Sequence, residues 1–358
     1  MKHKNYKINL FVFLFLIFLF LFHGYSFAKN IDVKKYWVIE KRIIPLPAGS
    51  KLLRKSISKL TQPDVDIMKK IVPKTSDQWK KFAISQAKKR LPVIEKLLKK
   101  SKIKVEKSFI ANIPVFKLTS EKVSSFYKNC IFIYLHGGGY VLFSGKSGLQ
   151  EPVLIAERIK VPVISIDYRM PPDYPFPAAI NDVVAVYKEI LKKKSIKSII
   201  IGGTSAGGGL ALAVVLKLKK LGIKLPDAIY AGTPWTDLTK TGDSYFINEG
   251  IDHVLITYNG LLEAAAKLYA GKYSLKNPLI SPVYGDFHGF PPTFFVSGTR
   301  DLFLSNVVRA YIKMKISGVK AELNVFEGFS HADYLFFFNT EESKEVYKLL
   351  DDFLKRHL

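Results

Sequence analysis

The fold of this chain is decided by the stretch Ile199-Ile200-Ile201-Gly202-Gly203-Thr204-Ser205-Ala206-Gly207-Gly208-Gly209. Its apolar run stops at glycines and resumes as the helix-forming segment 210–216, which predicts a strand, a sharp turn and a helix. Ser205 stands at the turn within Gly-x-Ser-x-Gly, the pattern of a nucleophile elbow with a strained serine backbone. Glycines are needed there because a Cβ on either flank would collide with the strand or the helix. We expect the Ala206 N–H, at the start of the helix, to point toward a developing oxyanion.

The same glycines do not make a phosphate-binding loop. A Walker loop requires lysine and then serine or threonine after its last glycine, whereas Gly208 and Gly209 follow Gly207 here. The dinucleotide-binding fingerprint is excluded because Ser205 occupies the place of its middle glycine. Serine between glycines also occurs in ordinary turns, so the catalytic interpretation depends on further elements.

A second glycine-rich turn lies upstream of the serine. Residues 131–135 are apolar and predict a buried strand that runs directly into His136-Gly137-Gly138-Gly139. Consecutive glycines after a strand can direct their amides into a common concavity that binds anions. In an acyl-transfer enzyme the N–H groups of Gly137 and Gly138 would join that of Ala206 in an oxyanion hole. The alternative is a flexible glycine loop, and we expect His136 to fix the loop by hydrogen bonding.

A serine nucleophile needs a base and an acid, and chain order limits the choice. In this fold the acid and then the histidine follow the serine. The downstream histidines are His253, His288, His331 and His357. His331 follows the predicted strand 323–326 and a glycine turn, where a mobile base belongs. Asp301 follows the preceding apolar strand, 293–298, and is the predicted acid.

The candidate residues share one expected location. The glycine loop, Ser205, Asp301 and His331 each come just after the carboxyl end of an apolar strand, the edge on which open α/β sheets build their sites. This order and placement predict a catalytic triad. Strand and helix alternate from about residue 104 to the end, which predicts a doubly wound, mostly parallel α/β sheet.

These motifs resemble the hormone-sensitive-lipase-like carboxylesterases, a branch of the α/β-hydrolases. The resemblance extends from about residue 36 to the C-terminus. It is carried by His136-Gly137-Gly138-Gly139, Gly203-Thr204-Ser205-Ala206-Gly207-Gly208, Pro234-Trp235-Thr236-Asp237-Leu238, Gly328-Phe329-Ser330-His331 and the segments 167–179 and 298–302. Family members often carry aspartate before the nucleophile. With Thr204 at this position, the chain resembles the threonine-bearing subset of the family. That subset looks like the group that holds esterases and lactone hydrolases.

The resemblance implies an α/β-hydrolase fold with a helical cap over the serine. The cap would comprise residues 29–103 and an insertion at about 240–285 in a catalytic domain over 104–358, although periodicity alone indicates only ordinary surface helices. The implied activity is serine-dependent hydrolysis of short- or medium-chain esters or lactones, without a cofactor. The alternatives are a peptidase or amidase of the same fold and, in a different class, a non-catalytic lipid-binding relative.

Residues 1–28 have the layout of a secretory signal peptide. Lysines precede the apolar run 10–22, and Ser26 and Ala28 are small residues at the −3 and −1 positions of a cleavage site. The apolar run is short for a bilayer span. We therefore expect export to the periplasm or the exterior, with an uncleaved membrane anchor as the alternative.

The formal net charge of +25 raises the question of a nucleic-acid partner. The lysines are spread over predicted helices, for example at 192–194 and 217–220, and are not gathered with aromatic residues. We therefore expect a solvated lysine surface and no nucleic-acid partner, with at most a weak, salt-screened attraction to anionic lipid head groups. A single cysteine, Cys130, excludes an intramolecular disulfide, and no His/Cys/Asp grouping has metal-ligand spacing. The expected partner is a small ester or lactone.

Overall fold

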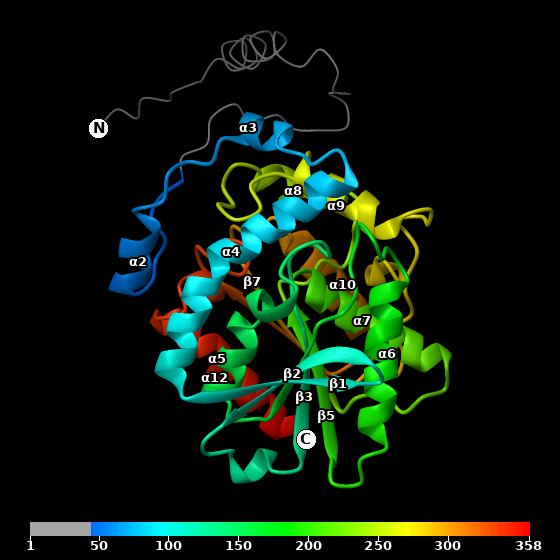
Figure 1. Ribbon diagram of the computed structural model, residues 1–358. Helices are drawn as coiled ribbons and strands as arrows, with labels where there is room; N and C mark the ends of the chain where they lie inside the picture. Colours follow the sequence, from blue (N-terminus) through cyan, green and yellow to red (C-terminus); the bar gives the residue numbers. More distant parts are fainter. Residues whose placement is uncertain (1–43) are drawn as a thin grey trace, which may run out of the picture. The chain divides into compact units, whose positions relative to one another are not determined.

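The computed structural model describes residues 44–358 (Figure 1), so the predicted signal peptide at 1–28 lies outside the described residues. Residues 46–358 form one compact unit around a sheet with the strand order β1-β2-β4-β3-β5-β6-β7-β8. The strands are β1 (Ile103–Ile110), β2 (Ile113–Ser120), β3 (Cys130–Leu135), β4 (Val163–Ile166), β5 (Ser198–Thr204), β6 (Ala228–Gly232), β7 (Thr293–Gly298) and β8 (Ala321–Phe326).

The sheet is parallel except at one edge. β1 and β2 form an antiparallel hairpin, and β2 pairs antiparallel with β4. The ladders from β4 through β3, β5, β6 and β7 to β8 are all parallel. The predicted mostly parallel, doubly wound sheet is thus confirmed, and the carboxyl ends of six of its strands meet at one edge.

Helices cover both faces of the sheet (Figure 1). The described helices are α2 (Lys51–Ile57), α3 (Val65–Lys70), α4 (Ser76–Ser101), α5 (Gln150–Arg158), α6 (Ala178–Leu191), α7 (Ala206–Lys220), α8 (Ser244–Ile247), α9 (Leu261–Ala270), α10 (Leu304–Ile316), α11 (Asp333–Phe336) and α12 (Glu341–His357). Helices α6, α7 and α10 share one apolar core with the sheet, whereas α5 and α12 share a second core on its other face. None of the helices within residues 44–358 is long and apolar enough to cross a membrane.

Strand β3 shows why the central strands are apolar throughout. Ile131, Ile133 and Leu135 belong to the core under α6 and α7, whereas Phe132 and Tyr134 belong to the core under α5 and α12. Successive side chains of a strand point to opposite faces. Because both faces are covered, a continuous apolar run is the sequence that buries well here.

Two segments outside the alternating pattern meet above the sheet. Helix α4 begins at a capping box in which Thr75 Oγ1 accepts from the Gln78 N–H and Gln78 Oε1 accepts from the Thr75 N–H. Its Trp79 is buried against Ala265 of α9 and against Val141, which follows the glycine loop. The N-terminal segment and the insertion therefore pack together on the chain that follows the glycine loop. Helix α4 ends at Ser101 and β1 begins at Ile103, while the finer domain boundaries stay a prediction.

Candidate active site

Ser205 occupies the tight turn between β5 and α7. Its backbone lies at φ 63° and ψ −125°, a left-handed conformation that L-residues rarely adopt, and its N–H donates to the Gly232 carbonyl over 2.8 Å. A Cβ added at Gly203 or Gly207 would overlap the Leu135 carbonyl oxygen. The two glycines thus let β3, β5 and α7 approach closely enough to hold the turn, as the sequence predicts.

The glycine loop after β3 lies beside the serine. A Cβ at Gly137 would be 3.3 Å from the Ser205 Cβ and 2.8 Å from the Thr204 carbonyl oxygen. Gly138 has φ 103°, which a side chain would strain. Within the described residues, the N–H groups of Gly137 and Gly138 make no hydrogen bond. The Ala206 N–H, first in α7, has no carbonyl within its helix to bind. These are the three donors that the sequence assigns to an oxyanion hole.

His136 braces this loop. The Nδ1–H of its buried ring donates to the Gly137 carbonyl over 2.8 Å, and the ring stacks on Tyr168 with centroids 4.2 Å apart. The Tyr168 hydroxyl donates to the His136 carbonyl over 2.6 Å. Burial is the main cause that lowers the pKa of His136, so the ring is neutral and serves as the predicted loop-fixing group.

His331 and Asp301 meet at the same edge of the sheet. The His331 Nδ1–H donates to Asp301 Oδ1 over 3.0 Å, and both side chains are buried. Asp301 is itself held by the Ser297 hydroxyl on Oδ2 and the Phe303 N–H on Oδ1, each over 2.8 Å. The bond at Nδ1 fixes the tautomer and leaves Nε2 as the basic nitrogen. This Nε2 has no hydrogen-bond partner among the described residues.

Opposing effects set the basicity of His331. Burial of the ring disfavours the charged imidazolium and is the largest single effect. The charge of Asp301 and its hydrogen bond, together with the charges of Asp252 and Asp333, outweigh burial and raise the pKa of His331. The structure therefore stabilises the imidazolium that would form when this ring takes a proton.

The other downstream histidines have different partners. His253 Nε2–H donates to Asp333 over 2.7 Å, and His288, which is exposed, pairs with Asp286 over 2.6 Å. His357 lies at the end of α12. Of the four candidates, His331 is the one that lines a cavity together with Ser205.

That cavity has a volume of about 200 Å³. Ser205, His331, Gly137 and Gly138 lie on its sheet side. Its apolar walls come from the predicted cap insertion, from α11 and from the loop after the glycines, through Val254, Leu255, Leu261, Leu262, Leu335, Phe336, Val141, Leu142 and Phe143. Arg90 of α4 also lines it, so both predicted cap segments contribute to the enclosure. Among the described residues, no group of three His, Cys, Asp or Glu side chains is placed to hold a metal ion.

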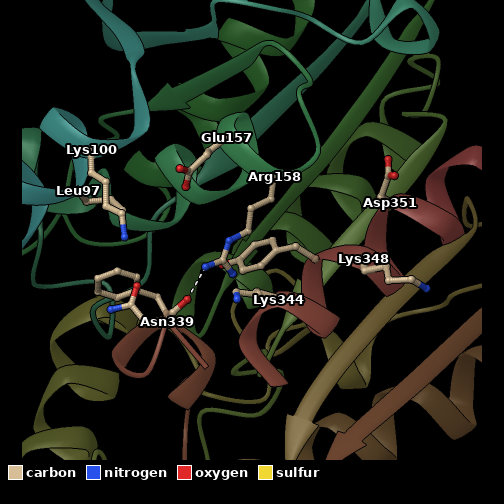
Figure 2. Close-up of a pocket in the computed structure, with 10 residues that line it drawn as sticks. Leu97, Lys100, Glu157, Arg158, Asn339, Lys344, Lys348 and Asp351 are labelled. Atoms are coloured by element: carbon tan, nitrogen blue, oxygen red, sulfur yellow. Dashed lines mark hydrogen bonds between the residues drawn. The ribbon is translucent and has the colours of Figure 1, made fainter. Parts of the chain in front are cut away.

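A larger cavity of about 500 Å³ lies elsewhere, among α4, α5 and α12 (Figure 2). The Arg158 guanidinium donates to the Phe338 carbonyl and also to the Ser343 carbonyl, the latter over 3.0 Å. It also lies over the Tyr347 ring, 4.9 Å from the centroid. This cavity contains no member of the predicted triad, and its arginine ties α5 to the start of α12.

A buried polar network behind the serine was not predicted. Thr204 Oγ1 and the Tyr334 hydroxyl are 2.7 Å apart, and the Tyr134 and Tyr230 hydroxyls each donate to Glu151 over 2.6 Å. Burial raises the pKa of Glu151, although these hydrogen bonds oppose the shift. The sequence offered one signal, an acidic residue directly before the apolar segment 152–156. The Thr204 hydroxyl thus takes part in this network through Tyr334.

Asp252 is a second residue that the sequence did not single out. Its buried carboxylate accepts hydrogen bonds from the Leu302 N–H over 2.8 Å and from the His331 N–H over 3.3 Å. It thus lies beside both loops that carry Asp301 and His331. No sequence motif marks it, because its neighbours come from distant parts of the chain.

Comparisons with known proteins agree on one protein family for this chain. The model of a family described by its α/β hydrolase fold matches residues 132–335. An acetyl-hydrolase of Streptomyces hygroscopicus is 34% identical over 171 residues, which cover 48% of this chain and 56% of that protein. The chain thus aligns with little more than half the length of this relative.

Solved structures cover more of the chain. An esterase of known crystal structure is 42% identical to this chain in sequence and superimposes on it with a TM-score of 0.88. The match covers 90% of this chain and 99% of the other. An esterase from the bacterial hormone-sensitive lipase family is 28% identical and has a TM-score of 0.69, covering 83% of this chain and 99% of the other.

Proposed function

This chain belongs to the α/β hydrolase fold family, among its hormone-sensitive-lipase-like esterases, and from that premise we propose that it hydrolyses carboxylic esters through Ser205, His331 and Asp301. The observation that carries the proposal is the joint placement of Ser205 and His331 on one cavity, with His331 bonded to buried Asp301. In the proposed reaction, His331 Nε2 takes the proton of the Ser205 hydroxyl. The serine oxygen then attacks the ester carbonyl carbon.

The proposed oxyanion hole consists of the N–H groups of Gly137, Gly138 and Ala206. Negative charge develops on the carbonyl oxygen of the tetrahedral intermediate, and donors already in place stabilise it without reorganisation. His331 then donates its proton to the leaving alcohol, which departs and leaves an acyl-serine. A water molecule that loses a proton to His331 attacks the acyl group, and the acid is released.

We propose short- to medium-chain esters or lactones as the substrate class. The cavity of about 200 Å³ has apolar walls, so each CH₂ that it buries contributes about 0.8 kcal/mol until the space is full. A longer chain must displace cap residues such as Leu261 and Leu262. No observation favours the peptidase alternative, and the intact set of three residues supports a catalyst over a non-catalytic lipid binder.

A panel of p-nitrophenyl esters tests this substrate class. We expect kcat/KM to peak at acyl chains of about four to eight carbons, a length set by the size of the apolar pocket. The matched p-nitroanilides should react far more slowly, since a carboxylesterase favours the better leaving group. Rates that still rise at sixteen carbons and increase at an oil–water interface would indicate a true lipase. Comparable rates on anilides would indicate an amidase.

A further inference from the structure

One carboxylate of the cap insertion joins three separate segments at the site. Asp252 Oδ1 accepts from the N–H groups of Val254 and Leu255, over 2.8 and 3.0 Å. Its Oδ2 accepts from the N–H groups of Leu302 and His331, over 2.8 and 3.3 Å. The side chain is completely buried.

The Oδ1 bonds are those of an ordinary Asp-initiated turn, in which a side chain caps the backbone just ahead of it. The Oδ2 bonds go beyond this turn. One comes from the residue that directly follows Asp301, and the other from the backbone of His331 itself. Val254 and Leu255 line the substrate cavity, so the same carboxylate connects the cavity wall with the loops of both residues.

The surroundings of Asp252 include the charged groups of every segment that packs there. Asp301 and His331 face it, Asp333 lies near the His331 ring, and the neighbouring His253 is paired with Asp333. Burial raises the pKa of Asp252 to about 6, and the charge of Asp301 acts in the same direction. The charge of His331 and the backbone N–H groups oppose that rise. Above that pKa the carboxylate is charged.

We propose that Asp252 is a positioning residue that holds the Asp301 and His331 loops in register and adds a second negative charge beside the His331 imidazolium. The proposal rests on the function proposed above and assigns to the cap insertion a role in the chemical step, in addition to enclosing substrate. Asp252 acts through His331 and the loop of Asp301 and does not itself contact the reacting atoms. A carboxylate is needed because four N–H groups converge on its two oxygens, and an amide can accept at one position only.

The test compares Asp252→Asn with wild type by kcat, KM and the pH dependence of kcat/KM on p-nitrophenyl butyrate. We expect kcat to fall about 10- to 100-fold, because small displacements of reacting groups cost this much, while KM changes less than about threefold. Loss of the negative charge should lower the pKa of His331. The acidic limb of kcat/KM should therefore move to lower pH, because the ring stays neutral, as a base must, further into the acid range.

Two further variants separate positioning from stability. Asp252→Glu keeps the charge but displaces the carboxylate, so kcat should fall while the acidic limb stays near that of wild type. Asp182→Asn is the matched control, since Asp182 is also buried and accepts from a backbone N–H, that of Arg169, but neither contacts the triad nor lines the cavity. It should lower the melting temperature without moving the limb.

An Asp252→Asn enzyme with the acidic limb and kcat of wild type overturns the proposal. So does a loss of activity that only follows the loss of folded protein, with the limb unmoved. Failure of the proposed function looks different: the wild-type enzyme would then hydrolyse no ester, or Ser205→Ala would keep the wild-type rate.

Discussion

His331 is the proposed base of the reaction, and its surroundings favour the charged form of its imidazole. Asp301, Asp252 and Asp333 together outweigh the effect of burial and raise the pKa of the ring above its ordinary value of 6.5. A general base works only when neutral, so activity must be lost as the pH falls through this raised pKa. The raised pKa makes His331 a stronger proton acceptor. It also means that the neutral ring, and with it the expected activity, is already lost in mild acid.

This electrostatic arrangement predicts the pH profile. The acidic limb of kcat/KM for p-nitrophenyl butyrate should have its midpoint above 6.5. Asp301→Asn should lower kcat by about 10⁴-fold, because an amide at this position leaves the ring in the wrong tautomer. Steady-state rates from pH 4.5 to 9 measure both effects. A midpoint below 6 in the wild-type enzyme, or a minor effect of Asp301→Asn, would contradict the electrostatic account of His331.

The residues differ in how far the sequence could reveal them. Ser205, Asp301 and His331 each follow a strand in a fixed chain order, and the structure brings His331 into contact with Asp301 and onto one cavity with Ser205. No sequence pattern identifies Glu151 or Asp252, because their hydrogen-bond partners are backbone and tyrosine groups up to 79 residues away along the chain. Only packing defines such neighbours, and no local pattern records them.

At the scale of elements, the elbow depends on the close contact of β3, β5 and α7. Strand β5 delivers Ser205 at its carboxyl end, and the helix N-terminus begins directly after it. At Gly207, α7 lies close to the end of β3, since an added Cβ would meet the carbonyl oxygens of Leu135 and His136. A single methyl group at this position must therefore separate the helix from the strand.

Gly207→Ala should consequently disturb both stability and activity. We expect a loss of about 1–3 kcal/mol in the free energy of unfolding, as for other overpacked sites. The accompanying shift of Ser205 should lower kcat about 100-fold or more. The control is Gly222→Ala, at a position where an added Cβ meets nothing within 4 Å; it should lose some stability, because φ is 63°, and keep its kcat. Thermal unfolding and kcat measure the comparison, and a fully active Gly207→Ala enzyme would refute this view of the elbow.

Most elements could be predicted because their sequence patterns match their burial. The apolar segments 131–135 and 293–298 are strands with both faces covered, and the helix-forming segment 210–216 lies in α7. The antiparallel hairpin of β1 and β2 was not anticipated as such. Its strands mix polar and apolar residues without a regular alternation, β1 is largely exposed, and the direction of pairing with β4 depends on a neighbour distant in sequence.

In the whole molecule, the cavity is lined by residues of the sheet edge and of the two predicted cap segments. The cavity is lined by Ser205 and His331 on the sheet side, by apolar residues of the insertion, α11 and the loop 141–143, and by Arg90 of α4. The family resemblance predicted a helical cap in these segments, whereas periodicity alone indicated only surface helices, and a separate cap domain stays a prediction. The pattern of charges did not help to predict the site, because lysines that are spread over exposed helix faces indicate no particular partner.

Export of the protein stays a prediction from the sequence. Residues 1–28 combine lysines, an apolar run and small residues before Lys29. Protein purified from an exporting host should have an N-terminus at or near Lys29 when sequenced. An intact Met1 on membrane-bound protein would instead support the anchored alternative.

Covalent labelling shows whether Ser205 is a nucleophile activated by His331. The folded enzyme is treated with a fluorophosphonate, which reacts with activated serines, and the modified peptide is identified by mass spectrometry. We predict one adduct per chain, on Ser205, and none on a correctly folded Ser205→Ala variant, whose ester hydrolysis should fall at least about 10³-fold. An adduct on another serine, or an Ser205→Ala enzyme that is still labelled and active, would contradict the account.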